Sequence, residues 1–394
     1  MTSLLLPIIY LAFISLGLPD SVLGAAWPNM YGELGVSVSS AGIVSMVIAA
    51  GTVLSSLASG WLHSKLGTGK ITAFSVLLTA VALFGFSVSD SFIKLCLFAI
   101  PYGIGAGSVD AVLNNYVAVH YQSRHMSWLH CMWGVGCSIG PVIMSYAITA
   151  GTWNDGYRTI SIAQVVLTAI LLFSLPLWKD AKPGGQDEKP HRRSSLKELL
   201  GIPGVKQVLA CFFCYSTLEW TTGMWTASYC TFYRGIPAEQ AAAWASLFYI
   251  GITVGRFICG FITFRVNDQN MIRLGQGFAA AGIIMTLLPF GKITLLTGLI
   301  LIGLGCAPIY PSIIHETPAN FGEENSQGIV GIQMASAYLG TTLMPPLFGF
   351  LAEHISFALY PYFLVIILLW MWVTSEKLHK LTLPQRERYC NAKR

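Results

Sequence analysis

The chain has 394 residues, of which 54% are hydrophobic and only 10% are charged. Soluble proteins carry about 25% charged residues, so this composition excludes a soluble protein and indicates one embedded in a membrane. The net charge of +5 carries no nucleic-acid signature, because the basic residues lie in short segments between apolar runs, where they determine membrane topology. The nine cysteines are interpreted as small apolar residues.

Apolar runs of about 20 residues, long enough to cross a bilayer as a helix, occur twelve times in the sequence. They cover residues 4–30, 39–62, 71–88, 92–119, 126–150, 160–177, 205–232, 241–264, 271–290, 293–315, 326–352 and 357–375. We therefore predict an all-α integral membrane protein. It consists of a six-helix bundle over 1–178, a cytoplasmic linker over 179–200, a second six-helix bundle over 201–376 and a cytoplasmic tail over 377–394. No cleavable signal peptide is expected, because no basic segment precedes the first run.

Lys and Arg residues are distributed unequally between the two sides of this predicted bundle. Of the 23 Lys and Arg residues, eighteen lie on the side of both termini, four lie on the opposite side, and Arg256 falls within the eighth span. Short loops rich in Lys and Arg stay in the cytoplasm. The sequence therefore predicts a multi-pass protein of the cytoplasmic membrane with both termini in the cytoplasm.

The first span contains a carboxylate directly after a proline, in Gly17-Leu-Pro-Asp-Ser21. Pro19 can break the helix locally because it donates no backbone hydrogen bond. Asp20 then lies at membrane depth, where a charged group is costly and usually functional. Two interpretations remain open: Asp20 is a proton-coupling residue, or its side chain caps the broken turn.

The loop between the second and third spans reads Gly60-Trp-Leu-His-Ser-Lys-Leu-Gly-Thr-Gly-Lys70. It resembles the cytoplasmic loop motif of the major facilitator superfamily, G-x-L-x-D-R-x-G-R-R, at Gly60, Leu62, Lys65 and Gly67. Ser64 stands where the family has Asp. The resemblance implies a gating loop that contains Gly60, Lys65 and Gly67, and a fold of two six-helix halves around a central site.

The fourth span contains Tyr102-Gly-Ile-Gly-Ala-Gly-Ser-Val-Asp-Ala-Val-Leu-Asn-Asn-Tyr116. Asn114 follows Asp110 by one helical turn and shares its face. The alternative to a functional Asp110 is a structural aspartate bonded to a neighbouring helix. The pattern acid-x-x-x-Asn-x-Tyr is similar to that of the fucose:proton symporter branch, where the acid is Glu. The resemblance implies that Asp110 carries the coupled proton, and we place Asn114 and Asn115 in the solute site.

The fifth span contains His130 and the run Trp133-Gly-Val-Gly-Cys-Ser-Ile-Gly-Pro141. Small residues spaced four apart, such as Gly136 and Gly140, let two membrane helices approach closely. His130 is interpreted as a residue of the solute site that could also relay protons. A buried histidine with satisfied hydrogen bonds is the alternative.

The seventh span contains Glu219, which stands at the repeat position of Asp20 and is assigned to the solute site. Trp225 and Tyr229 follow it at helical spacing, and their ring faces suit the C–H faces of a sugar. Aromatic packing is the plainer alternative. For Arg256 in the eighth span, we expect the guanidinium to extend to the inner surface, with a carboxylate partner as the alternative.

Three polar residues of the tenth and eleventh spans complete the predicted solute site, namely Tyr310, Gln333 and Tyr338. Tyr310 lies 200 residues after Asp110. His315-Glu316 is no zinc motif, because Ala319 stands where a second histidine is needed. No metal and no cofactor are expected, apart from the proton as coupling ion.

An internal repeat relates the two predicted bundles. Asp20 and Glu219 differ by 199 positions, and Gly51 and Gly251 differ by 200. The segment Gly103-Ile-Gly105 recurs as Gly303-Leu-Gly305, again 200 positions later. Matches at offsets of 199 and 200 in corresponding spans indicate two halves that arose by duplication.

These observations predict a secondary active transporter that works by alternating access, and not an enzyme. Proton-coupled symport of a small polar solute is favoured, with a sugar as the preferred class. A drug or metabolite exporter that works as a proton antiporter is the alternative. The expected partners are the solute and the lipid bilayer, without nucleic acid, and the chain is expected to act as a monomer.

Overall fold

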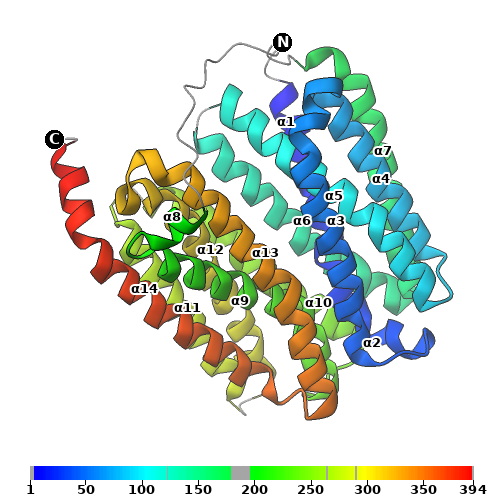
Figure 1. Ribbon diagram of the computed structural model, residues 1–394. Coiled ribbons are helices and arrows are strands. Elements are labelled where there is room, and N and C mark those ends of the chain that lie inside the picture. Colours follow the sequence, from blue (N-terminus) through cyan, green and yellow to red (C-terminus); the bar gives the residue numbers. More distant parts are fainter. Residues whose placement is uncertain (1–3, 122, 179–195, 263–264, 289–290, 393–394) are drawn as a thin grey trace.

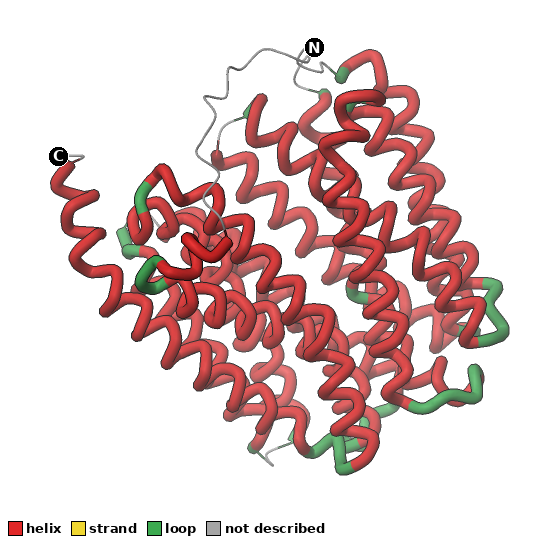
Figure 2. The backbone as a smooth tube through the Cα atoms, viewed as in Figure 1, coloured by secondary structure: helices red, strands yellow, loops and turns green. Residues whose placement is uncertain are grey.

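The computed structural model describes residues 4–121, 123–178, 196–262, 265–288 and 291–392. Figure 2 shows that these residues form long helices joined by short loops, and none of them lies in a strand. Helices suit a bilayer because each one satisfies its own backbone hydrogen bonds where no water is present.

The first half of the chain supplies six membrane-crossing segments. Its first segment is divided at Ser21, two residues after Pro19, and the other five are continuous helices. The elements are α1 (Leu5–Asp20), α2 (Val22–Glu33), η1 (Val38–Ser40), α3 (Ala41–Leu66), α4 (Thr68–Ser87), α5 (Phe92–His120), α6 (Ser123–Ala150), α7 (Trp153–Ser174) and η2 (Leu175–Leu177).

The second half supplies six further long helices, which follow a short helix at the end of the linker. The elements are α8 (Leu196–Gly201), α9 (Val205–Phe232), α10 (Ala238–Ile262), α11 (Asp268–Leu287), α12 (Lys292–Phe321), α13 (Glu323–His354) and α14 (Leu359–Ala392). The predicted linker lies mostly outside the described residues. The predicted tail is, as far as Ala392, a continuation of α14.

The prediction of an all-α protein with twelve long segments is confirmed. Nine segments of the described residues have the length and apolar character of a membrane span. The largest shift at a helix start concerns the sixth span, where α7 begins at Trp153 and not at residue 160. Its first turn contains Asp155, which forms a capping box with Thr152, and this polar turn hides the helix start from a search for apolar runs.

The internal repeat is visible in the packing of equivalent helices. Gly103 on α5 packs against the backbone of Ile48 on α3, and Gly303 on α12 packs in the same way against Phe248 on α10. All members of this contact are related by an offset of 200, as the sequence repeat predicted. The α3–α5 pair of the first half and the α10–α12 pair of the second therefore share their relative rotation and depth.

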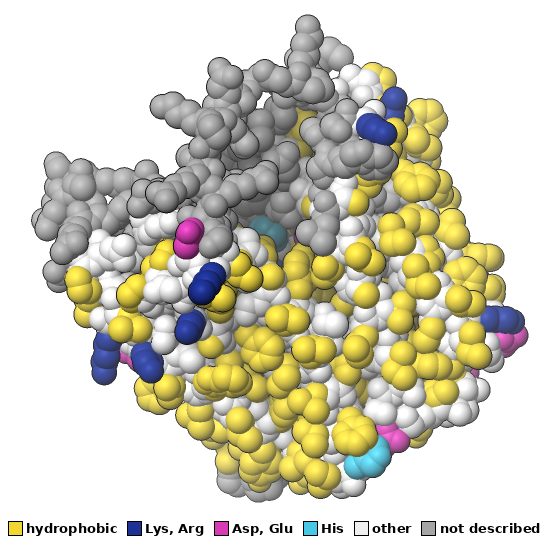
Figure 3. Space-filling model, in the orientation of Figure 1, with side chains coloured by type: hydrophobic (Ala, Val, Ile, Leu, Met, Phe, Trp, Pro, Cys, Tyr) yellow, Lys and Arg dark blue, Asp and Glu magenta, His cyan; other side chains and the backbone are white. Residues whose placement is uncertain are grey.

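The two halves meet along α6 and α10 and diverge toward the face on which both termini lie, which we call the termini face (Figure 1). Figure 3 shows hydrophobic side chains over most of the visible flank and a hollow between the halves at the termini face. Glu353 accepts a hydrogen bond from the Ser39 amide at 3.0 Å on the opposite face. The chain is therefore closed on the opposite face and open on the termini face.

Candidate functional site

The centre of the molecule holds several ionisable side chains, and Asp20 is the most completely bonded of them. The break between α1 and α2 places its carboxylate at the middle of the bundle. The Tyr102 hydroxyl donates to Asp20 Oδ1 at 2.6 Å, and the Trp133 indole Nε1 donates to Oδ2 at 2.9 Å. Both carboxyl oxygens therefore accept a hydrogen bond, an arrangement that suits the charged form.

Asp110 lies on α5 and has a different set of neighbours. Asn114 donates to Asp110 Oδ1 at 2.9 Å, as their one-turn spacing predicted. Tyr310 and Tyr338 of the second half come close enough to Asp110 to interact with it electrostatically, as does Asp20. No hydrogen bond to Asp110 Oδ2 occurs among the described residues. The side chain of Asn115, also predicted for the site, lies outside them.

Glu219 on α9 pairs with Arg256 on α10. Their closest atoms are 3.3 Å apart, and the two side chains are 11% and 13% exposed. Arg256 also lies over the Trp133 ring, 5.3 Å from its centroid, and donates to the His130 carbonyl oxygen at 3.5 Å. The expectation that Arg256 extends to the inner surface is wrong, because Glu219 and the Trp133 ring provide a closer partner within the bundle.

Aromatic rings gather around Tyr310 close to this centre. Tyr310 on α12 lies 5.2 Å from Phe212, 6.0 Å from Tyr215 and 6.4 Å from His130, measured between ring centroids. The contact with His130 joins the two halves, since His130 belongs to α6. Tyr310 and His130, which are both predicted for the solute site, therefore lie close together.

Three residues predicted for the solute site lie inside the second half. Trp225 has no exposed surface, and its indole donates to the Pro345 carbonyl oxygen at 2.8 Å. Tyr229 is also buried and donates to the Thr286 carbonyl oxygen at 3.2 Å. Gln333 is fully buried and bonds to Thr317 on α12. Their polar atoms are used for packing between neighbouring helices, so these side chains do not join the central group.

The predicted gating loop lies at the termini face, between α3 and α4. Gly67 has a φ of 76°, which an ordinary side chain would disfavour. The Lys65 side chain is exposed, and Gly60 lies among the residues whose surroundings are not described. These residues are far along the helices from the central carboxylates.

Tyr102 and Trp133 belong to the centre but were not predicted as site residues. The signal that the sequence offers for both residues is their helical spacing from a predicted site residue. Tyr102 precedes Asp110 by eight residues, about two turns of one helix, and Trp133 follows His130 by three. Spacing alone does not reveal which buried aromatic side chain meets a carboxylate from another helix.

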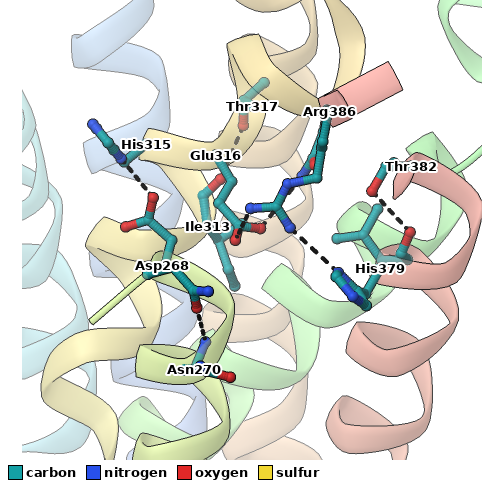
Figure 4. A network of polar contacts seen from close by, with 12 residues as sticks. Asp268, Asn270, Ile313, His315, Glu316, Thr317, His379, Thr382 and Arg386 are labelled. Carbon is teal, nitrogen blue, oxygen red and sulfur yellow. Dashed lines mark hydrogen bonds and ion pairs between the residues drawn. The ribbon is translucent and has the colours of Figure 1, made fainter. Parts of the chain in front are cut away.

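A second polar cluster lies near the termini face, where α11, α12 and α14 end or begin (Figure 4). Arg386 pairs with the buried Glu316 at 2.6 Å, and Asn320 donates to the same carboxylate at 3.4 Å. His315 pairs with Asp268 at 2.7 Å. All of these residues belong to the second half, so the cluster fastens neighbouring helices and does not join the two halves.

The central group can bind and exchange protons and can donate hydrogen bonds, and its members belong to both halves. The described residues contain no group of three or more His, Cys, Asp or Glu side chains that could hold a metal ion. The site combines three carboxylates, one guanidinium and several aromatic rings at the level where the halves meet.

Known proteins resemble the chain over most of its length. It is 23% identical over 385 residues to Bypass of stop codon protein 6 from Saccharomyces cerevisiae, covering 89% of this chain and 77% of the relative. It is 23% identical over 293 residues to the glucose/mannose transporter GlcP from Bacillus subtilis, covering 70% of each protein.

The solved structure of a bacterial homolog to the human lysosomal transporter Spinster, in an inward-facing and unoccupied conformation, has the same fold. Its TM-score is 0.74 at 13% identity, with 97% of this chain and 98% of that chain covered. The family model of the Major Facilitator Superfamily matches residues 9–315. Members of this family are transporters and not enzymes, and the chain belongs to the major facilitator superfamily.

Proposed function

We propose that this protein is a proton-coupled symporter that carries a small polar solute, with a sugar favoured, across the cytoplasmic membrane. The observation that carries the proposal is the central polar group, in which Asp20, Glu219 and Arg256 are linked across the interface through Trp133. Ionisable groups at membrane depth are costly and mark ion and substrate pathways. A site shared by two halves is exposed to one side and then to the other as the halves rock.

Asp110 is the proposed proton carrier, because its carboxyl group is the least committed of the three. Asp20 accepts two hydrogen bonds and Glu219 has a guanidinium partner, whereas Asp110 has one described hydrogen bond from Asn114. An apolar environment disfavours the charged form of a carboxyl group. A proton on the second oxygen of Asp110 would remove one negative charge from a site that contains three carboxylates and one guanidinium.

A sugar suits the remaining groups of the site. Carboxylates, amides and a guanidinium bind hydroxyl groups, and aromatic rings pack against the C–H faces of a pyranose. We assign these contacts to Asn114, Glu219, His130, Tyr310 and Tyr338. The similarity to a glucose/mannose transporter supports the sugar class.

Uptake by proteoliposomes tests this proposal. Purified protein is reconstituted, the external pH is lowered, and accumulation of radiolabelled D-glucose, D-mannose and L-fucose is compared with that in protein-free vesicles. We expect accumulation above the external concentration, and its loss when a protonophore collapses the pH gradient. Accumulation only when the inside is acidic would instead identify a proton antiporter, the class to which an exporter belongs.

A further inference from the structure

Trp133 connects two carboxylates that the internal repeat relates to each other. Its indole Nε1 donates to Asp20 Oδ2 at 2.9 Å on one side. On the other side, its ring lies 5.3 Å from the guanidinium carbon of Arg256, which pairs with Glu219 at 3.3 Å. A continuous path therefore runs from Asp20 in the first half to Glu219 in the second, through one indole ring.

The backbone around Trp133 is fixed by close helix contacts on both sides. Gly17 on α1 packs directly on the Trp133 carbonyl group, so closely that a Cβ atom there would overlap the oxygen. The next residue, Gly134, packs against Thr253 on α10. The Trp133 backbone is therefore held closely between α1 and α10, so that changes at Asp20 or Arg256 act on its side chain and not on its backbone.

The two ends of the indole have different electrostatic preferences. Its N–H group can only donate, and it donates more strongly to a charged carboxylate than to a neutral one. Its ring face attracts a cation. A charged Asp20 therefore fixes the ring in the orientation that receives Arg256, and protonation of Asp20 loosens the ring. A solute that draws Arg256 away must weaken the Asp20 contact in return, since coupling between two sites is reciprocal.

We propose that Trp133 is a positioning residue that couples the charge of Asp20 to the Glu219–Arg256 pair. The inference deepens the proposed function, since it names the residue through which the charge of Asp20 in one half affects the Glu219–Arg256 pair in the other. Asp110, which interacts electrostatically with Asp20, remains the proposed proton carrier. Further titratable groups face this path from the surrounding helices, namely Tyr102 and Asp110 on α5, His130 and Cys137 on α6, Tyr215 on α9 and Tyr249 on α10.

The first test needs no solute. Trp133→Phe keeps an aromatic face but removes the indole N–H donor. The tryptophan fluorescence of wild type minus that of this variant therefore reports the emission of Trp133 alone. Trp133→Tyr serves for the same subtraction should the Phe variant not fold. The same subtraction is made in the background of Asp20→Asn and in that of Glu219→Gln, each with and without Trp133→Phe. We expect both to shift the Trp133 emission, including Glu219→Gln, which acts through Arg256. An unchanged Trp133 emission in Glu219→Gln overturns the proposal.

The second test separates coupling from binding in proteoliposomes, with D-glucose as the probe. For Trp133→Phe we expect D-glucose exchange to stay within about threefold of wild type, while accumulation driven by a pH gradient falls about tenfold. Trp128→Phe is the matched control, because Trp128 lies on the same helix but is 44% exposed. Accumulation at the wild-type level in Trp133→Phe contradicts the proposal. If wild type carries no D-glucose, the sugar assignment fails and the emission test alone decides the role of Trp133.

Discussion

Asp20 and Asp110 are two aspartates in one site whose surroundings give them different tasks. Both oxygens of Asp20 accept hydrogen bonds, from Tyr102 and from Trp133, which can only donate through its indole. Asp110 accepts one described hydrogen bond, from Asn114. Replacing either carboxyl by an amide keeps the shape but removes the exchangeable proton. Because Asp20 accepts two side-chain hydrogen bonds and Asp110 accepts one, the two substitutions should differ in their effect on the fold.

For Asp110→Asn we expect uptake driven by a pH gradient to disappear while exchange of solute persists, because an amide cannot load and release a proton. For Asp20→Asn we expect an additional loss of stability of about 1–3 kcal/mol, because the amide nitrogen must face a hydrogen-bond donor. Thermal unfolding in detergent and proteoliposome transport measure the two effects. Proton-driven accumulation by Asp110→Asn would exclude Asp110 as the proton carrier.

The Glu219–Arg256 pair is buried, so removal of one partner leaves the other charge without compensation. We expect Glu219→Leu or Arg256→Leu alone to cost about 3–5 kcal/mol of unfolding free energy. The double variant Glu219→Leu/Arg256→Leu should be more stable than the sum of the single losses implies. Chemical denaturation in detergent measures this cycle, and additive losses would show that the two side chains do not act as a pair.

At the residue scale, the sequence could predict which positions carry charge but not which partners they meet. Asp20, Asp110 and Glu219 are conspicuous because charged groups are rare in apolar runs. Trp133 and Arg256 meet only because α6 and α10 pack against each other. Trp225 shows the converse case, since its helical spacing from Glu219 suggested a shared cavity, yet its rotation directs it toward Pro345 on α13.

At the scale of the helices, close packing depends on glycines that occupy equivalent places in both halves. Gly103 and Gly303 lie against the backbones of Ile48 and Phe248, where no side chain fits. Gly277 on α11 has no atom within 4 Å of the position of a Cβ atom. The three glycines all lie within helices. The same substitution at each of them therefore separates the effect of a close helix contact from that of helix propensity.

We expect Gly103→Ala and Gly303→Ala to destabilise the protein by similar amounts, each about 1–3 kcal/mol, because the added methyl group forces two helices apart. Gly277→Ala should leave the melting temperature unchanged or raise it slightly, since alanine favours a helix by about 1 kcal/mol. Melting temperatures of the three variants provide the measurement. A large loss in only one of the two equivalent positions would argue against matched packing in the halves.

The helices themselves follow from the length of apolar runs, and the exceptions have a polar cause. The seventh span matches α9, Val205–Phe232, at both ends. The tenth span was predicted to end at residue 315, whereas α12 continues to Phe321 because Glu316 is paired with Arg386 and so tolerates burial. An apolar search stops at a charged residue, although the helix continues through one that has a partner.

At the scale of the whole molecule, the repeat predicted two related halves, but it could not predict which face of the interface is closed. The equivalent halves pack in the same way internally, whereas their mutual arrangement differs between the states of a transporter. The orientation of the chain in the membrane rests on the Lys and Arg distribution.

A pair of cysteine variants tests that orientation. Lys197→Cys on α8 and Asp90→Cys between α4 and α5 both replace exposed residues, and they lie at opposite faces. We expect a membrane-impermeant maleimide to label Asp90→Cys on intact cells, and Lys197→Cys only after the membrane is broken. The reverse pattern would place both termini outside the cell.

The closed face depends on contacts that exist only while the two halves touch. Besides the Ser39–Glu353 bond, Ser145 donates to the Glu239 carbonyl oxygen at 2.6 Å, and Tyr31 meets Phe232 edge to face at 5.5 Å. Gly24 on α2 lies against the backbone of α9, where a Cβ atom would be 2.5 Å from the Met224 carbonyl oxygen. Gly24 is therefore the position at which one methyl group should disfavour closure and leave each half intact.

For Gly24→Ala we expect a shift toward the conformation that is open on the opposite face. The methyl group clashes only when α2 and α9 are in contact, so its cost of about 1–3 kcal/mol falls on the closed state alone and changes the population ratio about 5- to 150-fold. Spin labels at Gly32 and Gln240, which lie on different halves near that face, should report a longer distance in the variant. Gly277→Ala serves as the control, since it adds a methyl group where no atom is near. A folded Gly24→Ala protein with the wild-type distance distribution would show that this contact does not control closure of the opposite face.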